Sequence, residues 1–73
     1  MRMIPKEALH ALRERFQKGT RVELVKMDDP QAPPIGTKGT VLYIDDIGTI
    51  HVAWDCGGSL GVAYGEDVCR VIQ

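Results

Sequence analysis

Histidine and cysteine are the side chains of this chain best suited to metal binding or nucleophilic catalysis, and their spacing supports neither. His51 precedes Cys56 by five residues, and the sequence has no Cys-x-x-Cys, His-x-x-x-His or calcium-loop motif. A cysteine nucleophile also needs a base and a group that orients this base, and no such third member can be identified. We therefore expect no catalytic residue, no metal site and no cofactor, and a protein that is not an enzyme.

The few aromatic side chains could form a ligand-binding surface. Tyr43, Trp54 and Tyr64 together could build an aromatic cage or a peptide groove of the kind that small β-barrels use. Trp54, however, continues the alternation of Ile50 and Val52, and alternate residues of a strand share one face. We favour Trp54 as a core residue, and the cage stays open as the alternative.

An acidic segment with several prolines is the other candidate for recognition. Exposed loops on a rigid scaffold often carry binding residues, and the prolines would stiffen this one. Asp and Pro also cap turns and reduce the entropy of the unfolded chain, and we weigh this structural explanation equally. The predicted protein-binding surface adds the next acidic turn and two tyrosines, and consists of Asp28, Asp29, Pro33, Pro34, Tyr43, Asp45, Asp46 and Tyr64.

Basic residues concentrate near the beginning of the chain, although the formal net charge is only -1. A basic face would suit nucleic acid, and this is the alternative function. Glu14 and Glu23 lie among these basic residues, so we expect any such binding to be weak. The nucleic-acid-binding residues would be Arg13, Lys18, Arg21 and Lys26.

The elements that position these residues begin with a helix over residues 5–18. Pro5 suits the first helical turn, Leu9, Leu12 and Phe16 share one apolar arc, and Gly19 is a suitable stop. The pattern then changes to strand-like alternation. We expect five strands at residues 20–26, 40–44, 49–55, 59–63 and 68–72.

These elements predict a mainly β fold, a small five-stranded SH3-like barrel at residues 20–72 with an N-terminal α-helix that caps an open end. Closure into a barrel protects the edges of short strands. Residues 27–39 form the long first loop, 45–48 a tight turn, and Asp55 caps the turn after the third strand. With 73 residues, the chain forms a single domain, residues 1–73.

Several of these segments together resemble a known family. They are Lys-Gly-Thr-Arg-Val-Glu-Leu at 18–24, Met-Asp-Asp-Pro-Gln-Ala-Pro-Pro at 27–34, Gly-Thr-Lys-Gly-Thr-Val at 36–41 and an alternating pattern that ends in Trp54-Asp55. The chain resembles the bacterial and phage "domain of unknown function 4314" family over nearly its whole length. The resemblance implies a small SH3-like fold and a bacterial, phage or mobile-element context, and it implies no activity. Cys56 stands where the family commonly has Asn.

We therefore expect a non-enzymatic protein–protein interaction module, an accessory encoded by a phage or mobile element that acts on a host protein. The partner is an unidentified host or self-encoded protein, and both a monomer and a homodimer stay open. The sequence has no apolar run long enough to span a bilayer and no signal peptide. A cytoplasmic location with reduced Cys56 and Cys69 follows from this pattern.

Overall fold

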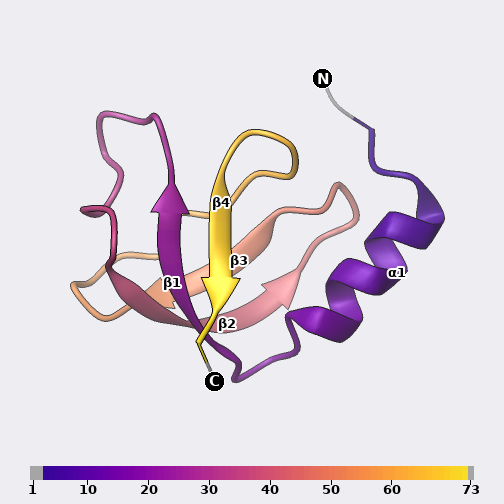
Figure 1. Ribbon diagram of the computed structural model, residues 1–73, viewed down its shortest axis with the longest axis horizontal. Coiled ribbons are helices and arrows are strands. Elements are labelled where there is room, and N and C mark those ends of the chain that lie inside the picture. Colours follow the sequence, from indigo (N-terminus) through magenta and orange to yellow (C-terminus); the bar gives the residue numbers. More distant parts are fainter. Residues whose placement is uncertain (1–2, 73) are drawn as a thin grey trace.

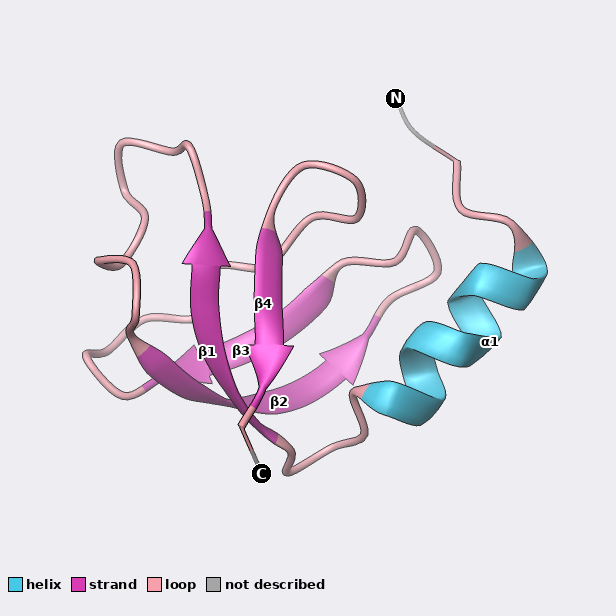
Figure 2. Ribbon diagram, viewed as in Figure 1, coloured by secondary structure: helices cyan, strands magenta, loops and turns pink. Residues whose placement is uncertain are grey.

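One helix and four strands make up the computed structural model, which describes residues 3–72 (Figure 1). The helix α1 (Lys6–Arg15) is followed by the strands β1 (Arg21–Lys26), β2 (Lys38–Ile44), β3 (Ile50–Trp54) and β4 (Val68–Val71). The strands form one antiparallel sheet in the order β3-β2-β1-β4. Figure 2 shows the helix beside this sheet rather than across its face. The chain is therefore a mainly β domain with one helix.

The apolar core lies on one face of the sheet because its strands alternate. Val22 and Leu24 of β1 point inward, as do Ile50, Val52 and Trp54 of β3, and none of these side chains is more than 5% exposed. The expected alternation of the third strand is thus confirmed. The buried apolar side chains among the described residues are Phe16, Val22, Leu24, Val41, Ile44, Ile50, Val52, Trp54, Val62 and Cys69.

A bulge in β2 changes which side chains of this strand face the core. Val41 pairs with Val52 and Tyr43 pairs with His51, so Leu42 lacks a pairing partner across the ladder. One extra residue reverses the alternation, which turns Tyr43 outward and keeps Ile44 in the core. The position of Tyr43 therefore depends on this irregularity.

The fourth expected strand, residues 59–63, does not form, and the prediction of a closed five-stranded barrel is wrong. Val62 makes one isolated bridge with Ile50, and the Trp54 amide donates to the Gly58 carbonyl at 3.2 Å. Between these two contacts, the Leu60 carbonyl accepts the indole N–H of Trp54 at 2.8 Å. The Leu60 carbonyl is thus bonded to a side chain instead of to a backbone N–H of β3. The stretch therefore follows β3 without joining the sheet, which stays open and four-stranded.

The helix is also shorter than the predicted 5–18. It ends at Arg15 because Phe16 leaves helical geometry, with φ −113° and ψ 65°, and enters the core at 5% exposure. Leu9 and Leu12 are half-buried against the same core. The helix thus contacts the core from the side, through Leu9 and Leu12 of the predicted apolar arc. No helix within residues 3–72 is long and apolar enough to cross a membrane.

Trp54 offers a direct test of this packing. Its side chain is 4% exposed, and a Cβ on the facing Gly39 would lie 2.9 Å from its ring. Replacing Trp54 with alanine is expected to lower the free energy of unfolding by about 3–5 kcal/mol. Trp54→Phe keeps most of the ring but leaves the Leu60 carbonyl unpaired, so a loss of about 1–3 kcal/mol is expected. Urea denaturation followed by circular dichroism measures both, and equal stability of Trp54→Phe and wild type would exclude a structural role for the indole hydrogen bond.

Candidate functional site

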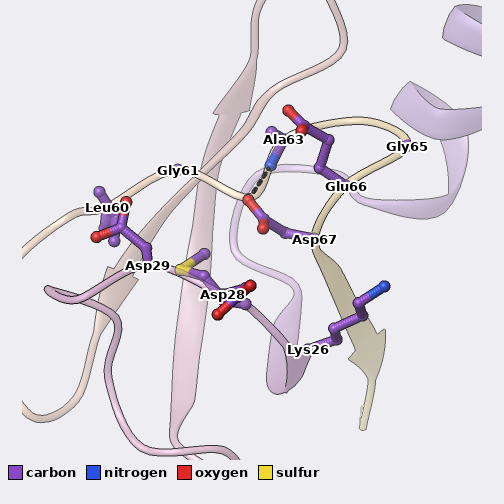
Figure 3. Close-up of a pocket in the computed structure, with 10 residues that line it drawn as sticks. Lys26, Asp28, Asp29, Leu60, Gly61, Ala63, Gly65, Glu66 and Asp67 are labelled. Atoms are coloured by element: carbon purple, nitrogen blue, oxygen red, sulfur yellow. Dashed lines mark hydrogen bonds between the residues drawn. The ribbon is translucent and has the colours of Figure 1, made fainter.

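A groove of about 610 Å³ lies between the end of β1 and the segment that leads into β4. Figure 3 shows the residues of both segments that line it. We call this hollow the acidic groove. It is lined by Lys26, Met27, Asp28, Asp29, Leu60, Gly61, Ala63, Gly65, Glu66 and Asp67.

The strand order explains why these two segments meet. β1 and β4 are antiparallel neighbours, and Lys26 at the end of β1 pairs with Val68 at the start of β4. The chain that leaves β1 and the chain that enters β4 therefore lie at the same end of the sheet. This arrangement brings Asp28 and Asp29 to the same groove as Glu66 and Asp67, although almost forty residues separate the two pairs.

The groove carries an excess of negative charge. Four carboxylates line it together with one ammonium group, that of Lys26. Among the side chains of residues 3–72, no basic group forms an ion pair with any of these carboxylates. Asp28, Asp29 and Glu66 are exposed, so their charges face solvent. The groove therefore carries a net negative charge, with Lys26 as the one basic residue of its lining.

Local hydrogen bonds fix the two acidic segments. Oδ1 of Asp29 accepts the backbone N–H of Gln31 at 2.8 Å, and its carbonyl accepts that of Ala32 at 2.9 Å. Oδ2 of Asp67 accepts the backbone N–H of Ala63 at 2.9 Å (Figure 3). The carbonyl oxygen of Ala63 in turn accepts the backbone N–H groups of Glu66 and Asp67, which closes the turn. The carboxylates thus project from hydrogen-bonded turns.

These carboxylates do not converge on one point. In the described part of the chain, no group of three His, Cys, Asp or Glu side chains could hold a metal ion. Charges spread along a groove suit an extended cationic ligand better than a single ion.

Of the predicted protein-binding residues, Asp28 and Asp29 are the two that line this groove. Pro33 instead lies beside Trp54 in a separate hollow of about 360 Å³, and the exposed Pro34 accepts hydrogen bonds from Thr37. Glu66 and Asp67 were not predicted as site residues, because periodicity along the chain identifies their segment only as a turn. The pairing of β1 with β4 is the signal that unites the two acidic segments.

The second acidic turn lies elsewhere, at the tip of the β2–β3 hairpin near α1 (Figure 1). Asp46 forms an ion pair with Arg13 of the helix at 3.0 Å. Tyr43 stacks on the His51 ring, with centroids 4.3 Å apart and planes 9° from parallel. Because Tyr43 lies on the outer face and Trp54 in the core, the aromatic cage does not form, and Trp54 is the core residue that we favoured.

Asp45 and His51 form a pair that the sequence analysis missed. Oδ2 of Asp45 lies 2.9 Å from Nε2 of His51, and its Oδ1 accepts the N–H groups of Ile47 and Thr49. His51 is therefore more than a surface side chain, because it is only 28% exposed and is bonded to Asp45. Partial burial acts to raise the pKa of Asp45, but the hydrogen bonds from His51, Thr49 and Ile47 outweigh it and lower this pKa.

Half of the predicted nucleic-acid-binding set is engaged in ion pairs. Arg13 bonds to Asp46, and Arg21 holds Asp55 with both terminal nitrogens, one at 2.9 Å. The hydrogen bond between Arg21 and Asp55 raises the pKa of the arginine and lowers that of the carboxyl. Asp55 therefore pairs across the sheet instead of capping the next turn. Lys18 and Lys26 are exposed.

The cysteines are free and lie in different environments. Cys56 is exposed in the turn after β3, whereas Cys69 is buried in β4. His51 bonds to Asp45 at the opposite end of β3 from Cys56, so the structure does not bring a Cys–His pair together. Burial raises the pKa of the Cys69 thiol to about 11, with a smaller opposing effect of Arg15.

Comparison with known proteins assigns the chain to a family. Residues 5–72 match the family described as "Domain of unknown function (DUF4314)", and the chain belongs to this family. The resemblance noted from the sequence is thereby confirmed. No curated protein matches the chain.

Asp45 predicts a defined dependence of stability on pH. Because its pKa is lowered in the folded protein, its contribution is present above the unfolded pKa of about 3.9 and is lost as pH falls through the folded value. Asp45→Asn keeps an acceptor for the turn but removes the charge. The difference in unfolding free energy between wild type and Asp45→Asn should be largest near neutral pH and shrink below about pH 4. Urea titrations at several pH values measure this difference, and a constant difference would contradict the assignment.

Thiol labelling tests the two cysteine environments. At neutral pH, a thiol-specific reagent is expected to modify Cys56 quickly and Cys69 only after unfolding, because Cys69 is 7% exposed and protonated. Mass spectrometry should find one adduct per native chain and two in guanidinium. Rapid native labelling of Cys69 would mean that β4 opens readily.

Proposed function

We propose that this member of the family is a non-enzymatic protein-binding module whose acidic groove takes an extended, lysine- or arginine-containing segment of a partner protein. One observation carries the proposal. Four carboxylates from two distant segments line one groove, and no ion pair within residues 3–72 neutralises them. Keeping like charges together costs stability, and a cationic ligand would remove that cost.

The dimensions of the groove support a peptide as the ligand. A volume of about 610 Å³ accommodates several side chains, and the hollow is open to solvent rather than enclosed. Leu60 and Met27 add apolar surface beside the charged groups, onto which the methylene stems of lysine or arginine can pack. An exposed, charged groove of this kind recognises an extended segment by its charge and by contacts along its chain.

The wider setting of the proposal follows from the sequence. We place the fold in the SH3-like class, as an open variant in which residues 59–63 occupy the position of a missing strand next to β3. The family resemblance supports a bacterial, phage or mobile-element origin. A cytoplasmic location, in which Cys56 and Cys69 stay reduced, and a partner encoded by the host or by the element itself complete the proposal. The acidic groove supplies the surface for such an accessory.

The alternative, nucleic-acid binding through Arg13, Lys18, Arg21 and Lys26, has less support. Two of the four cations already bond to carboxylates, and Lys26 borders the acidic groove. Phosphate binding needs a dense and free basic stripe. The same experiment tests both functions.

Fluorescence polarisation with labelled peptides tests the acidic groove. A fluorescein-labelled peptide with a Lys-Arg-Lys core is expected to bind at low ionic strength, and the matching Glu-Asp-Glu peptide is not. The double substitution Asp28→Lys/Glu66→Lys reverses one exposed carboxylate from each acidic segment and should weaken binding at least about tenfold. Both residues are exposed, so the melting temperature should change little.

Glu7→Lys/Asp46→Lys is the matched control, because it reverses the same number of exposed carboxylates outside the acidic groove. It should leave the affinity for the basic peptide close to that of wild type. Equal weakening by the control and the Asp28→Lys/Glu66→Lys variant would reduce the effect to net charge. Binding of a labelled DNA or RNA oligonucleotide, with no binding of the peptide, would favour the alternative function.

A further inference from the structure

We infer that the partner segment also carries an aliphatic side chain, which enters a second groove next to the acidic one; this inference rests on the proposed function. The second groove has a volume of about 140 Å³ and lies between the end of α1 and residues 62–69. We call it the apolar groove. Its lining includes the apolar side chains Leu12, Phe16, Ile50, Val62, Ala63, Val68 and Cys69, together with Arg15, Tyr64 and Asp67.

The two grooves adjoin each other. Ala63, Gly65 and Asp67 line both of them, so the turn between residues 63 and 67 forms a common rim. An extended peptide advances about 3.3 Å per residue. A segment that crosses this rim can therefore place one side chain in each groove within a few residues.

The chemistry of the apolar groove selects its occupant. Phe16, Ile50, Val62 and Cys69 belong to the buried core, so the floor presents carbon and sulfur to whatever fills the groove. A water molecule needs about two to four polar partners, and the polar side chains that line this groove are Arg15, Tyr64 and Asp67 rather than those of the floor. The volume is close to that of an apolar protein cavity of about 150 Å³ that binds benzene. One valine, leucine or isoleucine side chain fits this space.

The rim supplies the polar contacts that would hold the partner's main chain. Arg15 and Asp67 both border the apolar groove, which puts a donor and an acceptor at its entrance. The guanidinium of Arg15 lies 5.3 Å from the centre of the Phe16 ring, which keeps it close to the groove wall. The expected ligand is therefore a segment with lysine or arginine, followed or preceded closely by an aliphatic residue.

A peptide series tests this arrangement with the full chain. Each fluorescein-labelled peptide carries a Lys-Arg-Lys core and one leucine, placed at increasing distance before or after the core, and each has an alanine counterpart. At the best spacing, the leucine peptide is expected to bind about tenfold more tightly than the alanine peptide. The alanine peptides retain the charge, so they report on the acidic groove alone.

Two valines of similar exposure provide a matched pair of variants. Val68 is 45% exposed and lines the apolar groove, whereas Val25 is 43% exposed and lines neither groove. Val68→Phe should fill the groove and abolish the advantage of leucine while charge-dependent binding persists. Val25→Phe should preserve that advantage. Circular dichroism checks that both variants fold, and methyl chemical shifts of Leu12, Val62 and Val68 in the wild-type protein report on the contact independently of any variant.

The outcomes separate this inference from the proposed function. Equal affinity of the leucine and alanine peptides at every spacing would overturn the inference alone. Failure of every basic peptide to bind would overturn the proposed function and the inference with it. A wild-type dimer that Val68→Phe converts to a monomer would show that a second copy of the chain fills the apolar groove, which also overturns the inference.

Discussion

The hydrogen bond from the Trp54 indole to the Leu60 carbonyl is the contact on which the shape of the surface around the acidic groove depends. It connects the last residue of β3 to a segment that has no ladder of its own. Residues 57–67 contribute to all three hollows described above, so their path over the core determines the shape of each. The ring itself is fixed because it packs over Gly39, where a Cβ would not fit.

The distribution of ion pairs explains how a chain of nearly neutral charge presents a strongly negative groove. Arg13, Arg21 and Arg70 each pair with a carboxylate from a distant segment, and the last bonds to its register partner Glu23. These ion pairs neutralise three arginines on the sheet and at the hairpin tip, away from the acidic groove. Asp28, Asp29 and Glu66 remain without such partners among residues 3–72. The groove is thus negative because its carboxylates lack basic partners, and not because the chain as a whole has a large negative charge.

Much of the fold follows from local pattern, and the remainder depends on contacts that local pattern does not encode. Alternation in residues 21–26 and 50–54 predicted two strands well, because one face of each is buried. The same kind of alternation at Leu60 and Val62 predicted a strand that is absent, since the Trp54 side chain takes the carbonyl that a ladder would use. Of the four carboxylates in the acidic groove, the sequence predicted Asp28 and Asp29 as site residues. Predicting Glu66 and Asp67 would have required the knowledge that β1 pairs with β4, a contact between segments far apart in sequence.

The pairing of β1 with β4 also affects how the chain can fold during synthesis. Val22 pairs with Val71 and Glu23 with Arg70, so β1 cannot complete its pairing before β4 has been synthesised. Until residues 68–71 have left the ribosome, one edge of β1 has no partner, and the apolar side chains of Val22 and Leu24 lack part of their cover. Long-range pairing of this kind slows folding because a large loop must close first. A nascent chain of this protein can therefore pair β1, β2 and β3 early, whereas the edge of the sheet next to β1 and the second wall of the acidic groove form only with β4.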